Sequence, residues 1–145
     1  MNKSDRAVSK FAGGYNCAQS VFYAFCEDLH LDPDTALKMS AGFGGGIGRK
    51  GEVCGAVTGG IMALGAKYGR GEKEDPTVAE ATYARTREFM DQFAGKHGSC
   101  LCRELLNGCD LATEEGQKAF RENDFKNKIC TPCVRSAVEM VEKMM

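Results

Sequence analysis

Cysteine is the residue type in this chain with the greatest capacity for chemistry. The sequence has 145 residues and contains eight cysteines but only two histidines. A cysteine thiolate can bind soft metals and can attack a disulfide. The eight positions are Cys17, Cys26, Cys54, Cys100, Cys102, Cys109, Cys130 and Cys133.

The compartment decides how this cysteine content is interpreted. The N-terminal stretch MNKSDRAVSKFAGGYN is polar and lacks the apolar segment of a signal peptide, so we expect a cytoplasmic protein. In a reducing compartment, many cysteines indicate metal, cluster or redox chemistry rather than a disulfide framework.

Four cysteines share a position relative to the predicted helices, because each stands at a helix N-terminus. These are Cys17, Cys54, Cys102 and Cys130. Unpaired backbone N–H groups and the helix dipole favour a thiolate at this position. We therefore expect the pKa of all four thiols to be lowered.

The remaining cysteines have weaker signals. Cys26 lies on an apolar helix face, where core packing is expected, and Cys109 follows a glycine in a turn. Three further residues are secondary candidates for the site. Cys100 forms C-x-C with Cys102, and His97 lies nearby in KHGSCLC. Cys133 forms C-x-x-C with Cys130, although inside its helix it could instead pack in the core.

Almost every segment has the hydrophobic period of a helix, and none alternates like a strand. Caps, prolines and glycines mark the ends of the predicted helices. These helices run from Ser4 to Gly13-Gly14, Asn16 to Leu29, Asp32-Pro33 to Gly42, Val53 to Tyr68, Asp75-Pro76 to Gly95, and Cys102 to Leu106. A further short helix begins at Thr113, and the last runs from Thr131-Pro132 to Met145. The sequence predicts one compact all-α domain over residues 1–145, in which a glycine-rich loop leads into a small-residue helix.

The glycine-rich loop contains GIGRKG, Gly46 to Gly51, which matches G-x-G-x-x-G. A dinucleotide site needs a strand before these glycines, whereas a helix is predicted there, so we expect no nucleotide. Two explanations remain: close packing of the following helix, or backbone N–H groups brought near an anionic group held by Cys54. The supporting glycines are Gly44, Gly45, Gly46, Gly48, Gly51, Gly55 and Gly59.

Composition narrows the range of partners. The net charge of −1 does not favour nucleic acid, and no apolar run is long enough to span a membrane. The absence of C-x-x-C-H indicates no covalently attached haem. A redox partner protein is expected, and the small Gly/Ala helix faces are compatible with a homodimer.

The ordered set of motifs resembles the redox-active protein family named for its C-GCAxxG-C-C cysteine pattern. The matching segments are Asn16-Cys17-Ala18-Gln19, SAGFGGGIGRKGEVCGAVTGGIMALGAKYG with its CGAVTG motif at Cys54–Gly59, Cys102-Arg103-Glu104-Leu105-Leu106, and Cys130. The resemblance implies a small helical protein whose family cysteines are Cys17, Cys54, Cys102 and Cys130. A similar module accompanies haem in split-Soret cytochromes, where it has an iron–sulfur cluster.

The leading hypothesis is therefore an iron–sulfur cluster held by these four cysteines for electron transfer or redox sensing. One alternative is thiol–disulfide exchange, in which Cys54 attacks and Cys17 or Cys130 resolves. A second alternative is a structural zinc site, and a third is that the cysteines only pack in the core.

Overall fold

The computed structural model describes residues 1–145 as eight α-helices, two short non-α helical segments and no strand. The helices are α1 (Lys3–Ala12), α2 (Cys17–Ala24), α3 (Pro33–Ser40), α4 (Gly55–Tyr68), α5 (Thr77–His97), α6 (Cys102–Leu105), α7 (Glu114–Glu122) and α8 (Thr131–Met144). A 3₁₀ turn, η1 (Ala41–Phe43), follows α3, and a π-helical turn, η2 (Lys126–Cys130), precedes α8. The all-α prediction is confirmed.

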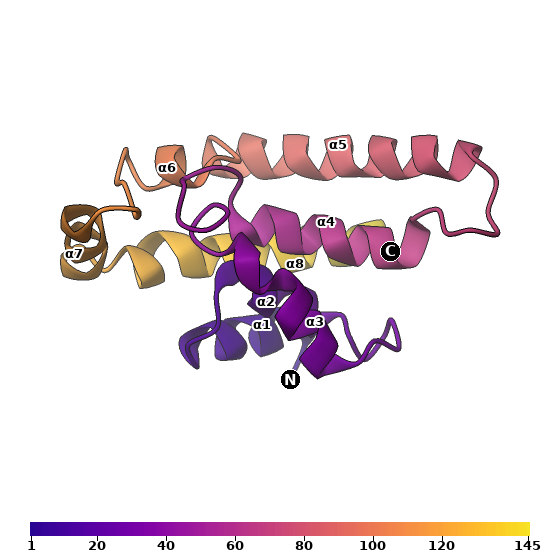
Figure 1. The fold of residues 1–145 in the computed structure, drawn as a ribbon, viewed down its shortest axis with the longest axis horizontal. Coiled ribbons are helices and arrows are strands. Elements are labelled where there is room, and N and C mark those ends of the chain that lie inside the picture. Colours follow the sequence, from indigo (N-terminus) through magenta and orange to yellow (C-terminus); the bar gives the residue numbers. More distant parts are fainter.

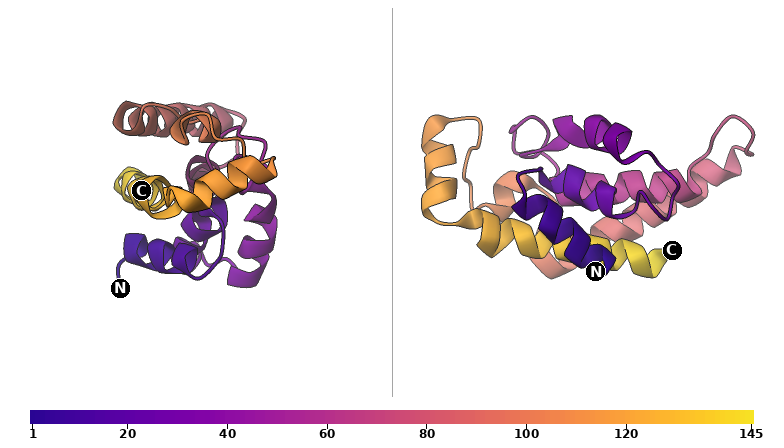
Figure 2. Two further views of the ribbon diagram at one scale, coloured as in Figure 1. Left: turned by 90° about the vertical axis from the view of Figure 1, so that its left-hand side faces the viewer. Right: turned by 90° about the horizontal axis from the view of Figure 1, so that it is seen from below.

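The two helices α4 and α8 form the centre of the bundle (Figures 1 and 2). The long helix α5 packs on one side of them, while α1 and α2 pack on the other side and α3 covers α2. The short helices α6 and α7 lie at one end, and α7 runs across the direction of α8 rather than along it (Figure 2). That end of the bundle is the one at which α4 and α8 begin.

Several helix ends have the caps that the sequence predicts. Asn16 and Gln19 form a reciprocal capping box at the start of α2. Three predicted ends are wrong by a few residues. Helix α2 ends at Ala24 and not at Leu29, and turns follow it. Asn2, not Ser4, caps α1 by accepting from the backbone of Asp5. Helix α5 continues through Gly95 and stops at Gly98, whose φ of 92° is left-handed, because that conformation ends the helix and glycine adopts it without strain.

Glycines on α4 allow the neighbouring helices to come unusually close. A Cβ atom at Gly59 would lie 2.7 Å from the Ala18 carbonyl oxygen on α2. A Cβ atom at Gly60 would lie 2.6 Å from the Phe89 ring on α5. The rest of α4 and α8 then packs against fully buried side chains such as Phe89 and Phe93, which form the hydrophobic core. The predicted close packing of this small-residue helix is present.

The glycine-rich loop has a left-handed backbone over five consecutive residues. The φ angles of Gly45, Gly46, Ile47, Gly48 and Arg49 lie between 59° and 71°. Glycine adopts this conformation readily, but each non-glycine residue costs roughly 1–2 kcal/mol. Ile47 and Arg49 therefore store backbone strain. Helical segments precede this loop, so the strand that a dinucleotide fingerprint requires is absent.

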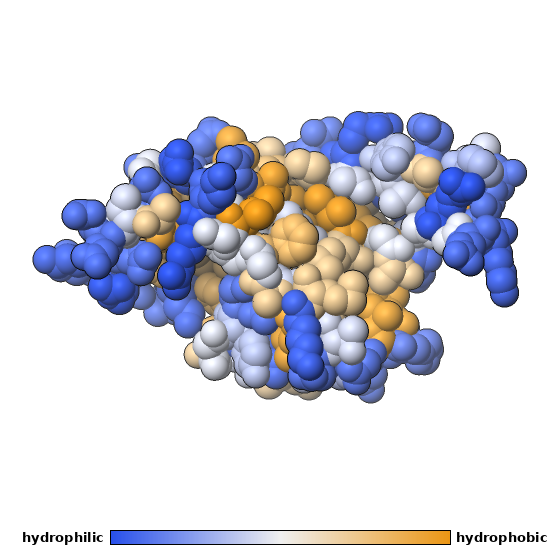
Figure 3. Space-filling model, in the orientation of Figure 1, coloured by the Kyte–Doolittle hydropathy of each residue, from blue (hydrophilic) through white to orange (hydrophobic).

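The surface divides into polar ends and a more apolar middle (Figure 3). An apolar hollow in this surface is lined by residues including Phe22, Leu31, Met39 and Met62. None of the helices combines the length and apolarity that crossing a membrane requires. A homodimer stays a prediction.

Candidate functional site

Five cysteines line one cavity of about 230 Å³ at the end of the bundle. They are Cys17, Cys54, Cys102, Cys130 and Cys133. Four of them are the cysteines that the sequence predicts to converge. Their sulfurs come from α2, from the residue before α4, from α6, and from the junction of η2 with α8. Segments distant in the sequence thus contribute to a single site.

A short two-stranded contact brings Cys54 and Cys102 together. Val53 and Leu101 form an isolated antiparallel β-bridge. The Cys54 N–H donates to the Cys100 carbonyl and the Cys102 N–H donates to the Glu52 carbonyl, both at 2.7 Å. A Cβ atom at Gly46 would lie 2.6 Å from the Cys102 Cβ, so only glycine leaves room for this cysteine against the loop.

The capping box and a glycine position Cys17. Asn16 caps α2 and also donates from Nδ2 to the Ala41 carbonyl at 2.9 Å, which ties the start of α2 to the glycine-rich loop. A Cβ atom at Gly55 would lie 3.0 Å from the Cys17 Cβ. The first turn of α4 can therefore approach Cys17 only because residue 55 is glycine.

Helical spacing places Cys130 and Cys133 together. The π-helical turn η2 runs directly into α8, so Cys130 lies within continuous helical structure and not at a free N-terminus. Cys130 is therefore the N-cap residue of α8, as predicted, but the preceding turn means that this helix start is not free. Residues three apart share a helix face, and Cys133, which is 1% exposed, therefore reaches the same cavity. The C-x-x-C spacing in the sequence therefore indicated that Cys133 lies beside Cys130.

Cys54 has the environment of a thiolate. Contact with the Cys133 thiol lowers the pKa of Cys54, and the backbone N–H groups of Ala56 and Val57 lower it further, against the effect of burial. The same contact, together with burial, raises the pKa of Cys133. The two shifts are opposite, so Cys54 loses its proton more readily than Cys133.

The expectation of a lowered pKa is wrong for two of the four predicted cysteines. Contact with Cys130, followed by burial, raises the pKa of Cys17 well above its ordinary value. Burial and the nearby Cys54 raise the pKa of Cys102 to about 12. Burial and contact with neighbouring thiols thus outweigh the effect of the helix N-terminus on these two cysteines, and charge on nearby thiols adds to the increase.

The other sulfur atoms point elsewhere. Cys26 is buried in the core, and its thiol faces the Phe22 carbonyl at 3.6 Å. The Cys100 thiol faces the Met90 carbonyl at 3.4 Å, and the Cys109 thiol donates to the Gly116 carbonyl at 3.0 Å. None of the three lines the cavity.

His97 also lies outside the cavity lining. Its ring stacks on Phe93 with 4.7 Å between centroids, and its buried Nε2 has no hydrogen-bond partner. Burial lowers the pKa of His97. The structure therefore brings Cys133, but neither Cys100 nor His97, to the predicted site.

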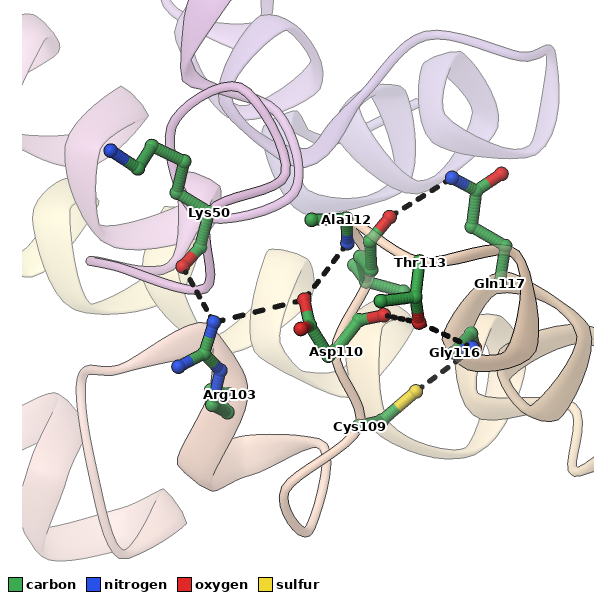
Figure 4. Close-up of polar contacts among 9 residues, drawn as sticks. Lys50, Arg103, Cys109, Asp110, Ala112, Thr113, Gly116 and Gln117 are labelled. Atoms are coloured by element: carbon green, nitrogen blue, oxygen red, sulfur yellow. Dashed lines mark hydrogen bonds and ion pairs between the residues drawn. The ribbon is translucent and has the colours of Figure 1, made fainter.

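Arg103 links the glycine-rich loop to the segment that leads into α7 (Figure 4). Its Nη2 donates to the Lys50 carbonyl at 3.1 Å and lies 3.7 Å from an Asp110 carboxylate oxygen. Asp110 in turn accepts from the Ala112 N–H, and the Thr113 hydroxyl caps α7 by accepting from the Gly116 N–H. These contacts hold α7 at the cavity, where Gln117, Phe120 and Arg121 join the wall.

Two arginines at the cavity, Arg49 and Arg121, were not singled out by the sequence. Arg49 stands inside the G-x-G-x-x-G letters, where attention falls on the glycines, and Arg121 has no motif around it.

The glycines that the sequence marks as supporting the site have different structural roles. Gly45, Gly46 and Gly55 line the cavity, while Gly44 allows Asn16 to approach and Gly51 allows Arg103 to approach.

The donor set fits a thiolate-bound iron–sulfur group in its chemistry. It supplies five thiols, and the N–H groups of Gly45 and Gly46 in the wall donate to no other group of the chain. All eight cysteines are free thiols, and no three His, Cys, Asp or Glu side chains surround one point as ligands of a single metal ion would. The cysteines thus line one cavity, but they are not arranged as the ligands of a single metal ion.

Comparison with known proteins places the chain in a family. Residues 15–144 match the family described as "Putative redox-active protein (C_GCAxxG_C_C)". The chain belongs to this family. An uncharacterized protein of Archaeoglobus fulgidus is 31% identical over 114 residues, which cover 74% of this chain and 76% of that relative. No solved structure matches the chain.

Proposed function

We propose that the five-cysteine cavity is the redox centre of this protein and that it holds an iron–sulfur cluster. Cys17, Cys54, Cys102 and Cys130 are the proposed ligands, and Cys133 is an additional sulfur beside Cys54. The supporting observation is that five cysteines from separate elements line a single cavity. Four thiolates are the usual ligand set of a cluster.

The surrounding residues suit a group with negative charge. Unbonded backbone N–H groups of Gly45 and Gly46 lie in the wall, and both charged side chains of the lining are arginines. Such groups stabilise thiolates that would otherwise repel one another. When bound, the cluster would supply a one-electron couple for electron transfer or sensing.

Anaerobic purification with iron and sulfide assays tests the proposal. We expect coloured protein that contains both elements, and Cys17→Ser, Cys54→Ser, Cys102→Ser or Cys130→Ser each to lose most of the iron. Cys109→Ser is the matched control, because it lies outside the cavity and serine can still donate to the Gly116 carbonyl. Colourless wild-type protein without iron would exclude the cluster. Zinc in its place would favour the structural-metal alternative.

Cys54 and Cys133 line the same cavity and shift each other's pKa in opposite directions, which supports a second candidate, thiol–disulfide exchange. The Cys54 thiolate attacks an organic disulfide, so a mixed disulfide forms and one substrate thiolate leaves. Cys133 then loses its proton and attacks Cys54, which releases the second substrate thiolate and forms the Cys54–Cys133 disulfide. Two electrons pass from the protein to the substrate.

This version replaces Cys17 or Cys130 with Cys133 as the resolving cysteine. Titration of the metal-free protein in a graded thiol–disulfide buffer should show one two-electron step. Cys133→Ser should remove the step and trap a mixed disulfide on Cys54, whereas Cys17→Ser should keep it. Loss of the step in Cys17→Ser but not in Cys133→Ser would refute the assignment of Cys133.

A further inference from the structure

The charges that line the cavity all have one sign. The lining includes Arg49 and Arg121 but no lysine, aspartate or glutamate. Arg49 and Arg121 are both exposed and form no ion pair, as is also true of Arg70, Arg85 and Arg87. Their guanidinium groups are therefore free to pair with an anion that enters the cavity.

The backbone of Arg49 is held in a costly conformation. Its φ is 66°, a left-handed angle that a non-glycine residue adopts only at a cost of roughly 1–2 kcal/mol. Gly45 makes room for the arginine stem, since a Cβ atom there would lie 2.7 Å from the Arg49 Cγ. The loop thus directs a strained cationic residue toward the cavity.

Backbone groups add to the positive potential. The N–H groups of Gly45 and Gly46 donate no hydrogen bond within the chain, and both residues line the cavity. Backbone N–H groups in a loop of this kind are favourable partners for anions. Two guanidinium groups and two free N–H donors therefore border the same space.

The size and walls of the cavity restrict what can enter. Its volume of about 230 Å³ lies below the roughly 300–1,000 Å³ typical of pockets for drug-sized ligands, so the ligand is small. Apolar side chains such as Phe11, Phe120 and Ile129 form much of the wall. A guanidinium group pairs best with a carboxylate or phosphate, through two parallel hydrogen bonds.

We infer that Arg49 and Arg121 form an anion-binding rim that selects small carboxylate- or phosphate-bearing molecules for the cysteine cavity. The inference deepens the proposed function by naming the class of molecule that reaches the redox site. It rests on that cavity being a reactive cysteine site, and not on the presence of a cluster.

Two alkylating reagents of nearly the same shape test the rim in the reduced, metal-free protein. Iodoacetate carries a carboxylate, whereas iodoacetamide is neutral. We would measure the rate at which each labels the cavity cysteines, mapped by peptide mass spectrometry, at one pH. The ratio of the two rates then cancels the thiolate fraction. The same ratio for N-acetylcysteine is the reference.

We expect the ratio of iodoacetate to iodoacetamide rates to exceed the reference about ten-fold, because a cleft with one sign of charge concentrates the opposite ion. Arg49→Gln with Arg121→Gln should return the ratio to the reference, and Arg49→Lys should retain part of the preference. Arg87→Gln is the matched control, since Arg87 is exposed on α5 and does not line the cavity. A wild-type ratio equal to the reference would overturn the inference.

Competition identifies the anion and keeps the test valid if the double variant fails to fold. Inorganic phosphate and succinate are added separately while iodoacetate labels the wild-type protein. Slower labelling with phosphate supports a phosphate-bearing ligand, and slower labelling with succinate supports a carboxylate. If neither anion slows labelling at concentrations up to tens of millimolar, the rim does not bind them and the inference fails. Iron content plays no part in these measurements, so failure of the cluster proposal is recorded separately.

Discussion

The middle and one end of the α4–α8 pair use small residues for opposite purposes. In the middle, Gly60 allows Phe89 and Val141 to approach closely within the hydrophobic core. At the end where α4 and α8 begin, Gly46 and Gly55 allow Cys102 and Cys17 to approach, yet an open cavity remains. The same pair of helices thus has a packed core along its middle and a cysteine-lined cavity at its start.

The two regions differ in what surrounds them. The core is covered by the long helix α5 with its aromatic residues Phe89 and Phe93. The cysteine end is enclosed by a strained loop, a π-helical turn and α7, of which only Gly116 is buried. We therefore expect the core to contribute more of the folding free energy than the cysteine end, because this contribution scales with the apolar area removed from water.

The largest expected effect separates the core from the cysteine end through Phe89. Phe89→Ala should lower the free energy of unfolding by about 3–5 kcal/mol, because it leaves a cavity in a fully buried site. Urea denaturation measures this change. Tyr83→Ala, at a 56% exposed position on the same helix, should cost under about 0.5 kcal/mol. If folded Phe89→Ala also changed the alkylation rates of the cavity cysteines, the two regions would not be separate.

A glycine pair in the loop tests whether close approach or backbone conformation matters at the cysteine end. Gly46→Ala should cost more than the roughly 1–2 kcal/mol of a left-handed alanine, because its Cβ also meets Cys102. Gly48→Ala is the control, since its φ is 59° but no atom lies within 4 Å of the added Cβ. Equal losses of stability in urea denaturation would show that contact with Cys102 is unimportant.

Alkaline pH should weaken the reduced, metal-free protein through its cysteine end. The pKa of Cys102 is about 12 in the folded protein, whereas an unfolded thiol titrates near 8.5. Above that pH the unfolded chain binds fewer protons, so stability should fall by up to about 1.4 kcal/mol per pH unit for this group.

Cys17 and Cys133, whose pKa values are also raised, act in the same direction, and Cys54 acts in the opposite one. Denaturation between pH 7.5 and 10 with a reductant and a chelator measures the slope. Cys102→Ser should make it shallower, and an unchanged slope would contradict the assignment to Cys102.

The smallest expected effect is a gain in stability at Ile47. Its φ is 67°, and 39% of its surface is exposed, so Ile47→Gly relieves strain while losing little burial. After the entropy cost of glycine, we expect about 0.5–1 kcal/mol of added stability in denaturant titrations. A loss of stability would show that the Ile47 side chain contributes more by packing than its backbone costs.

Local signals predicted the elements well and the cysteine chemistry only in part. The Asn16 capping box and the Pro33 helix start are as expected, because caps act between residues a few positions apart. The direction of the Cys54 pKa shift was predicted from its helix start, although contact with Cys133 contributes more to it than the backbone N–H groups do. The raised pKa values of Cys17 and Cys102 were not predicted, because they depend on burial and on neighbouring thiols from other elements.

The sequence by itself determined the all-helical fold, the family, and the four cysteines that meet at one end of the bundle. Only the tertiary structure decided that Cys133 joins them and that Arg49 and Arg121 line the same cavity. It also decided that Cys100 and His97 lie outside the lining. The physical reason is that helix formation depends on local spacing, while a cavity depends on which faces of distant helices meet and on the charges they bring there.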